Sequence, residues 1–165
     1  MMYQLAAMVG QDARGRELMQ GMQQRLVEIE QTAANLKRRP RVFFEEWYDP
    51  HISAIAWVSE LMGIAGGDDC FPELASQAMG KDRLSADGSE IVRRNPDIIF
   101  GAWCGRKFRP DHVLVRVGWE NVNAVKNKQL FEIKSAEILQ PGPAALTDGV
   151  EQIHRLIMNW AEKHG

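Results

Sequence analysis

The sequence lacks a charge excess, a long apolar run and a basic leader. Its 20 Lys and Arg against 22 Asp and Glu give a formal net charge of -2, which argues against a general nucleic-acid binder. No apolar run approaches the roughly 20 residues that cross a bilayer. Residues 1–10 carry no Lys or Arg before their apolar stretch, so they lack the basic segment of a secretory signal. If the chain is complete, we therefore expect a cytoplasmic protein.

Cysteine and histidine are sparse as well. Cys70 and Cys104 can form at most one bridge, and although their spacing does not decide the matter, we expect free thiols. The four histidines are scattered, and no CxxC or HExxH spacing is present. The sequence therefore predicts no metal site and no cofactor.

Catalytic motifs are missing too. There is no GxGxxG, no P-loop and no GxSxG elbow, so Ser135 has no support as a nucleophile. Glu45 and Glu46 are neighbours in a predicted strand, where successive side chains point to opposite faces, so they make a poor acid/base pair. We expect a protein that is not an enzyme, with a small α/β hydrolase or lyase as a weak alternative.

What the sequence does contain begins with one long helix. Apolar residues recur every three or four positions over residues 12–36, with Asp12 as the expected N-cap and Pro40 beyond the end. Such a helix is roughly 35–40 Å long at 1.5 Å per residue. Only one stripe of it is apolar, so we expect it to pack on one side.

After Pro40, short apolar strands alternate with helices. Strands are predicted at residues 42–44, 98–100 and 130–133, and helices at 52–64, around 111–116 and from Pro143 onward. Gly66-Gly67 is the expected end of the 52–64 helix. This alternation predicts an α/β fold, a mostly parallel sheet covered by helices and preceded by a long connecting helix. We divide the chain into a connecting helical segment, 1–40, and an α/β ligand-binding lobe, 41–165.

Aromatic and polar side chains follow all three predicted strands. In open parallel sheets ligands bind outside the carboxyl ends of the strands, so these positions are the site candidates. They are Glu45, Glu46, Trp47 and Tyr48, then Trp103 and Cys104, then Ser135, Leu139 and Gln140. Aromatic faces suit a broad ligand, and the polar groups would orient it. The alternative is that these are ordinary loop residues and that Trp47 and Trp103 cap the core.

Several stretches together resemble a known family. They are residues 41–47 (RVFFEEW), 60–68 (ELMGIAGGD), 90–99 (EIVRRNPDII), 118–127 (GWENVNAVKN) and 139–143 (LQPGP). The ordered set resembles the C-terminal half of cobalamin- and iron-siderophore-type periplasmic binding proteins, and most of all the cobalamin-binding branch. The resemblance implies one lobe of a two-lobe binding protein, with residues 12–36 as the helix that joins the lobes.

The resemblance also implies a function. The chain would be the solute-binding component of an ABC importer, would capture cobalamin or a related metal chelate without covalent chemistry, and would be periplasmic. Haem and ferric siderophores are the other expected cargoes. In this family an acidic residue after the Gly-Gly docks on arginines of the permease, which here matches Asp68, with Asp69 beside it. The alternative is that Asp68 or Asp69 only caps the next turn.

The first lobe of the family pattern is absent from this sequence. A homodimer formed through the long helix is therefore a reasonable hypothesis. The alternative function is a stand-alone dimeric α/β interaction or storage domain that lacks the first lobe.

Overall fold

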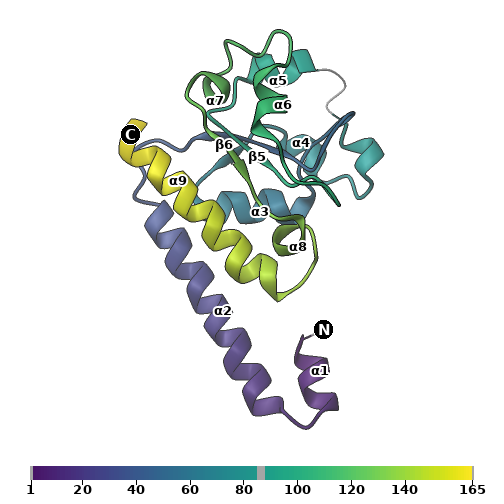
Figure 1. Cartoon of the computed structure of the whole chain (residues 1–165). Helices are drawn as coiled ribbons and strands as arrows, with labels where there is room; N and C mark the ends of the chain where they lie inside the picture. Colours follow the sequence, from purple (N-terminus) through teal and green to yellow (C-terminus); the bar gives the residue numbers. More distant parts are fainter. Residues whose placement is uncertain (1, 85–87, 165) are drawn as a thin grey trace.

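The computed structural model describes residues 2–84 and 88–164. A short helix, α1 (Met2–Met8), leads into the long helix α2 (Asp12–Ala33), which runs up into an α/β body that holds all the strands (Figure 1). The first half of α2 projects beyond the body with α1 beside it (Figure 1). Its last turns are anchored, because Ile29 and Ala33 are fully buried.

The body is built on one parallel sheet with the strand order β4–β1–β5–β6. The strands are β1 (Arg41–Glu45), β4 (Asp68–Asp69), β5 (Ile98–Gly101) and β6 (Leu130–Glu132). The predicted parallel sheet and its three strands are confirmed, and the register sets Glu45 beside Gly101 and Gly101 beside Glu132. β4 escapes prediction because its two aspartates carry no apolar strand pattern.

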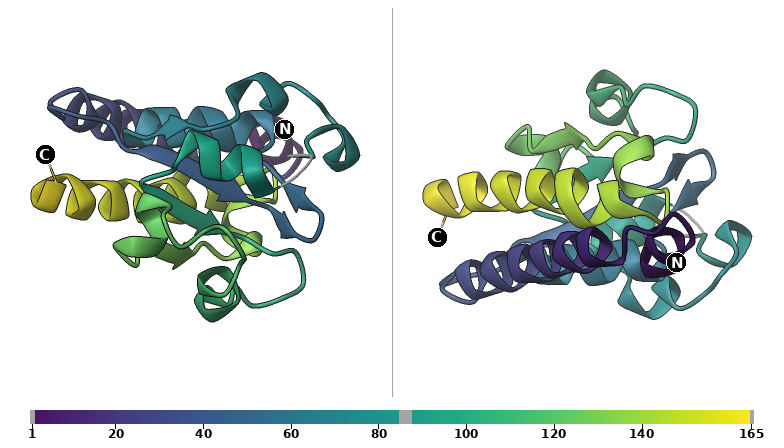
Figure 2. Two further views of the ribbon diagram at one scale, coloured as in Figure 1. Left: turned by 90° about the horizontal axis from the view of Figure 1, so that it is seen from above. Right: turned by 90° about the horizontal axis from the view of Figure 1, so that it is seen from below.

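Helices cover both faces of this sheet. One core joins Val42 and Phe44 to α2, α3 (Ala56–Ala65) and α9 (Val150–His164), and α2 and α9 lie side by side in Figure 2. The other core joins Phe43 to α5 (Gly88–Arg94), α6 (Pro110–Leu114) and α7 (Asn123–Lys126). Apart from Arg41, the residues of β1 and β5 are fully buried, as is usual for parallel sheets, and this explains their continuous apolar runs.

A small hairpin corrects one predicted helix. Trp47–Tyr48 (β2) pairs antiparallel with His51–Ile52 (β3), so the helix expected from residue 52 begins only at Ala56. Other short elements are α4 (Pro72–Ala75), α8 (Ser135–Ile138), the 3-10 turn η1 (Gly80–Asp82) and the π-helical turn η2 (Ala145–Gly149).

Helix ends agree with the sequence in part. Gly66 closes α3 with a left-handed φ of 104°, as predicted, since only glycine adopts this conformation without strain. Residue 143 is helical and begins the turn that leads through η2 into α9. The N-cap prediction is wrong: Asp12 is the first residue of α2, and Gln11 holds the N-cap position without a side-chain hydrogen bond.

Candidate functional site

The carboxyl end of the sheet is organised around one buried carboxylate. Glu45, the last residue of β1, is 0% exposed. Arg116 donates to both of its oxygens, from Nη1 to Oε1 at 2.7 Å and from Nη2 to Oε2 at 3.0 Å. The indole N–H of Trp103 donates to Oε2 at 3.0 Å, and His51 Nδ1 lies 2.9 Å from Oε1. Glu45 thus ties together two segments that leave the sheet at this end, the one after β1 and the one after β5.

These contacts decide the charge of Glu45. Burial by itself would raise its pKa, but hydrogen bonds from His51 and Arg116 outweigh that effect and hold the pKa of Glu45 below its ordinary value. The group is therefore an ionised anchor at neutral pH, and its lone pairs are engaged inside the protein.

Trp103 also lies inside the core rather than at the surface. It is 3% exposed, with ring centroids 4.7 Å from Tyr48 and 5.0 Å from Phe108. Both side chains point inward, and the roles of Glu45 and Trp103 as ligand contacts stay predictions. The buried position of Trp103 agrees with the alternative in which this residue caps the core.

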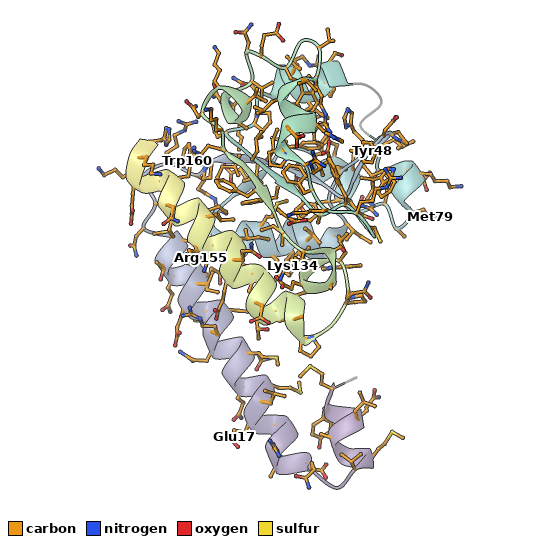
Figure 3. The ribbon with its side chains drawn as sticks, viewed as in Figure 1. Glu17, Tyr48, Met79, Lys134, Arg155 and Trp160 are labelled. Carbon is orange, nitrogen blue, oxygen red and sulfur yellow. The ribbon has the colours of Figure 1, made fainter. Side chains whose placement is uncertain are left out.

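An aromatic and cationic group remains at the surface above Trp103. Trp47 and Tyr48 are half-buried, with ring centroids 5.3 Å apart, and the exposed Arg106 donates to the Tyr48 hydroxyl at 2.7 Å. The Arg106 guanidinium stands 5.9 Å from the Trp47 ring centroid and 5.8 Å from that of Tyr48. We call Trp47, Tyr48 and Arg106 the rim surface. Tyr48 lies on the side of the body away from Trp160 of α9 (Figure 3).

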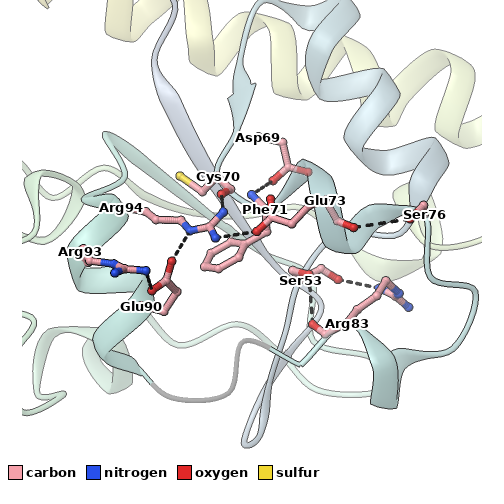
Figure 4. A network of polar contacts seen from close by, with 10 residues as sticks. All are labelled: Ser53, Asp69, Cys70, Phe71, Glu73, Ser76, Arg83, Glu90, Arg93 and Arg94. Atoms are coloured by element: carbon pink, nitrogen blue, oxygen red, sulfur yellow. Dashed lines mark hydrogen bonds and ion pairs between the residues drawn. The ribbon is translucent and has the colours of Figure 1, made fainter.

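The neighbouring hairpin is held by a second ion pair. Glu46 Oε2 accepts from Nη1 of Arg83 at 2.5 Å, and the same nitrogen donates to the carbonyl of Ser53 at 2.6 Å. Ser53 in turn donates its hydroxyl to the carbonyl of Arg83 (Figure 4). The predicted site residue Glu46 is therefore engaged in fixing the β2–β3 hairpin on which the rim surface stands.

The predicted site residues after the third strand make no direct contact with this group in the described part of the chain. Ser135 is half-buried at the start of α8, Leu139 packs on the first core, and Gln140 is exposed. Among residues 2–84 and 88–164, no hydrogen bond, ion pair or ring contact joins these three to the rim surface. Cys104 is an exposed free thiol next to the buried Trp103.

A groove opens beyond Gln140. It has a volume of about 480 Å³ and lies between α1, α2, α3 and residues 141–146, with mostly apolar walls and Glu60 as its charged lining residue. Trp57 forms part of the wall, and its indole N–H donates to the carbonyl of Ile138 at 3.1 Å.

The two aspartates predicted to dock lie at the opposite end of the sheet. Asp68 and Asp69 pair with Arg41 and Val42, at the start of β1. Asp69 accepts from the N–H of Phe71 at 2.9 Å (Figure 4) and from the hydroxyl of Ser59 at 2.6 Å. Burial raises the pKa of Asp69. Its carboxylate thus serves the turn before α4. The side chain of Asp68 remains exposed, and its Oδ1 forms an ion pair with Arg39 Nε at 2.9 Å.

His51 and Arg116 were not among the predicted site residues. The partner of Arg116 is 71 positions away in the chain, so no local pattern points to this ion pair. Arg116 stands between two exposed valines, and only the fold shows that it reaches Glu45. Within the described part of the chain, no group of three or more His, Cys, Asp or Glu could hold a metal ion.

Cys70 is buried, and burial raises the pKa of its thiol to about 12. Among the described residues, no helix combines the length and hydrophobicity that crossing a membrane requires.

Comparison with known proteins adds a family and several similar folds. The family model described as "Periplasmic binding protein" matches residues 1–137. No curated protein matches the chain. A possible iron-binding periplasmic solute-binding protein of Staphylococcus epidermidis has a similar structure at 19% identity and a TM-score of 0.76, covering 94% of this chain and 59% of that one.

Two further solved structures are similar. The heme complex of Staphylococcus aureus IsdE has 20% identity and a TM-score of 0.71, covering 94% of this chain and 62% of that one. The vitamin B12 binding protein BtuF of Vibrio cholerae has 22% identity and a TM-score of 0.65, covering 90% and 55%. At these identities the likeness shows the fold, and the chain spans less than two thirds of the length of each of these proteins.

Proposed function

Because this chain belongs to the periplasmic binding protein family, we propose that it captures a metal chelate in the periplasm and delivers it to an ABC importer. Membership of this family makes it a binding protein rather than an enzyme, which agrees with the missing catalytic motifs. Capture by such a protein is non-covalent, and the metal arrives as cargo.

The observation that carries the proposal is the rim surface. The carboxyl ends of β1 and β5 are in register, so the segments that follow them leave the sheet side by side. Trp47, Tyr48 and Arg106 then present two rings and a cation, while the buried Glu45 and Trp103 hold the backbone beneath them. Fixed rings cover a broad apolar ligand at little entropic cost, and a guanidinium recognises carboxylate or phosphate.

A corrin or porphyrin chelate matches this chemistry. Cobalamin carries a phosphate and haem carries carboxylates, and both offer a wide ring system to an aromatic surface. Similar solved structures described as binding vitamin B12 and heme support this class of cargo. We take cobalamin as the leading cargo, with haem and a ferric siderophore as the competing ones.

A titration tests the proposal. The chain is titrated with cyanocobalamin, haem and a ferric siderophore, with binding followed by absorbance and by calorimetry. Replacing Trp47 by Ala should weaken binding of the preferred chelate by about 1–3 kcal/mol, since a stacking partner is lost. Arg106→Gln should weaken it about tenfold or more if the cargo is anionic.

The matched control is Arg109→Gln. Arg109 belongs to the same loop and is exposed, but it pairs with Asp111 rather than with the rim surface. Binding that is lost equally in Arg106→Gln and Arg109→Gln would indicate only a change in net charge. If none of the three chelates gives heat or a spectral change, the capture proposal fails.

Docking on the permease is proposed for Asp68 alone. Its side chain is 58% exposed, so it can meet a basic permease surface, whereas Asp69 is committed to its turn. Exposed charges act mainly on the rate of encounter. Asp68→Asn should therefore slow association with the permease several-fold at low salt.

Asp111→Asn is the matched control for docking, because the side chain of Asp111 is also 58% exposed and paired with an arginine. Equal association rates for wild type and Asp68→Asn would remove Asp68 from the docking surface. Fractionation of cells that express the natural gene tests the periplasmic location.

A further inference from the structure

One exposed face of α2 carries charged residues on both sides of a glycine. Residues three or four positions apart form one stripe along the helix: Arg14, Glu17, Leu18, Gly21, Arg25 and Glu28. All six are exposed, and the one large apolar side chain among them, Leu18, is 53% exposed. A groove of about 540 Å³ follows the stripe, with Gly21 among its lining residues and Thr147 of η2 on its other side. We call this set the Gly21 stripe.

Neither steric contact nor backbone conformation within the described residues requires a glycine at position 21. A Cβ built on it meets no atom within 4 Å, and its φ is not in the left-handed region. Glycine inside a helix costs about 0.5–1 kcal/mol relative to alanine. A glycine at such a position permits the close approach of another backbone. In contrast, Gly15 is explained inside the chain, because its Cβ would stand 2.4 Å from that of Ala6 in α1.

The charges around Gly21 are self-complementary. In a two-fold dimer residue i meets residue j, and j meets i. With two copies of α2 antiparallel and crossing at Gly21, the residue four positions before it meets the residue four positions after it, which sets Glu17 against Arg25. Seven positions out, Arg14 meets Glu28. The two-fold axis doubles both pairs.

The opposite orientation is disfavoured by the same residues. A parallel pair would set Glu17 against Glu17 and Arg25 against Arg25, and like charges in contact are repulsive. Arg14 and Glu17 have no ion-pair partner among the described residues, and Arg25 and Glu28 pair only at the surface, with half-exposed side chains. Glu17 lies on the side of α2 away from α1, so α1 leaves it open (Figure 3).

We propose that a second copy of this chain binds along the Gly21 stripe, forming an antiparallel α2–α2 dimer with Gly21 at the crossing point. The apolar contact comes from Leu18 and Met22, and the four ion pairs fix the direction. A helix-pair interface is smaller than a standard protein interface, so we expect a dissociation constant of about 1–100 µM. The dimer does not depend on chelate capture.

Sedimentation equilibrium of the chain from low to several hundred micromolar tests the dimer. Gly21→Gln should weaken association about tenfold or more by blocking the close approach, while circular dichroism shows equal or greater helix stability, since glycine is removed. This variant separates loss of the dimer from loss of the fold.

A charge swap tests the orientation. Glu17→Arg should weaken the dimer about tenfold, because two arginines then face two others, and Glu17→Arg with Arg25→Glu should restore it. The control is Glu30→Arg, which makes the same charge change on the opposite face of α2. A monomer at all concentrations, a dimer indifferent to Gly21→Gln, or equal effects of Glu17→Arg and Glu30→Arg would each overturn the proposal. A monomeric chain would mean that something other than a second copy covers this face.

Discussion

At the amino end of the sheet, Asp97 is 3% exposed and accepts from Arg38, from the N–H of Arg41 and from Asn123, at 2.8, 3.0 and 3.0 Å. At the carboxyl end, Glu45 is equally buried and accepts from Arg116, Trp103 and His51. Both carboxylates fasten chain segments to the sheet. The two ends of the sheet differ in the side chains that the attached segments present at the surface.

At the amino end, the polar groups stabilise the fold. Arg41 is the first residue of β1 and Arg38 lies shortly before it, and Asp69 closes the turn that follows β4. At the carboxyl end, Glu45 holds two longer segments, the β2–β3 hairpin and the segment from 102 to 122. These segments present Trp47, Tyr48 and Arg106 at the surface. These rings and this cation are the reason for proposing that ligand binds at the carboxyl end.

The largest expected effect is the difference in stability loss when each of the two tryptophans at the carboxyl end is replaced by alanine. Trp103→Ala should lower the free energy of unfolding by about 3–5 kcal/mol, because it empties the core and removes a donor from Glu45. Trp47→Ala should cost less than about 1.5 kcal/mol, since Trp47 is half-buried and its N–H serves only the nearby carbonyl of Asp49. Urea unfolding measures both. Equal losses would mean that the rim surface is part of the core.

The next effect compares the two buried carboxylates. Glu45→Gln should cost about 3 kcal/mol, because it leaves the guanidinium of Arg116, 14% exposed, without its counter-charge. Asp97→Asn should cost about 1–2 kcal/mol, since the side chains of Arg38 and Arg41 are 51% and 47% exposed and stay hydrated. The same unfolding experiment ranks them, and a larger loss for Asp97→Asn would reverse the comparison.

The smallest effect is in the pH dependence of stability. The folded pKa of Glu45 is lowered, so its contribution is complete above the unfolded pKa of about 4.3 and is lost as pH falls through the folded pKa. The folded pKa of Asp69 is raised, so its contribution is complete below the unfolded pKa of about 3.9 and is lost as pH rises through the folded pKa.

Unfolding free energies of wild type, Glu45→Gln and Asp69→Asn between pH 3 and 7 measure these slopes. Relative to wild type, Glu45→Gln should lose less stability on acidification, and Asp69→Asn should lose more. Parallel curves for both variants would show that neither carboxylate titrates differently in the folded protein.

The sequence predicted the parts of the fold that depend on local patterns. Continuous apolar runs identified β1, β5 and β6, and the period of three or four identified α2. The hairpin that shortens the 52–64 helix was not predicted, because its strands are two residues each and carry no period.

The site was less accessible from the sequence, for a physical reason. Strand ends can be read from the chain, and they identified Trp47 and Tyr48. Whether a side chain at a strand end turns inward depends on partners that are distant in sequence, such as Arg116 for Glu45 and Phe108 for Trp103. Strand-end residues that look alike in the sequence therefore differ in the structure, because some of their side chains are buried and others reach the surface.

Hydrogen–deuterium exchange tests the difference between the two ends most directly. The chain is compared free and saturated with the chelate that binds most tightly. Protection should rise in residues 46–52 and 103–107 and stay unchanged in 66–71. Protection confined to 66–71, or to the groove beside residues 141–146, would contradict ligand binding at the carboxyl end.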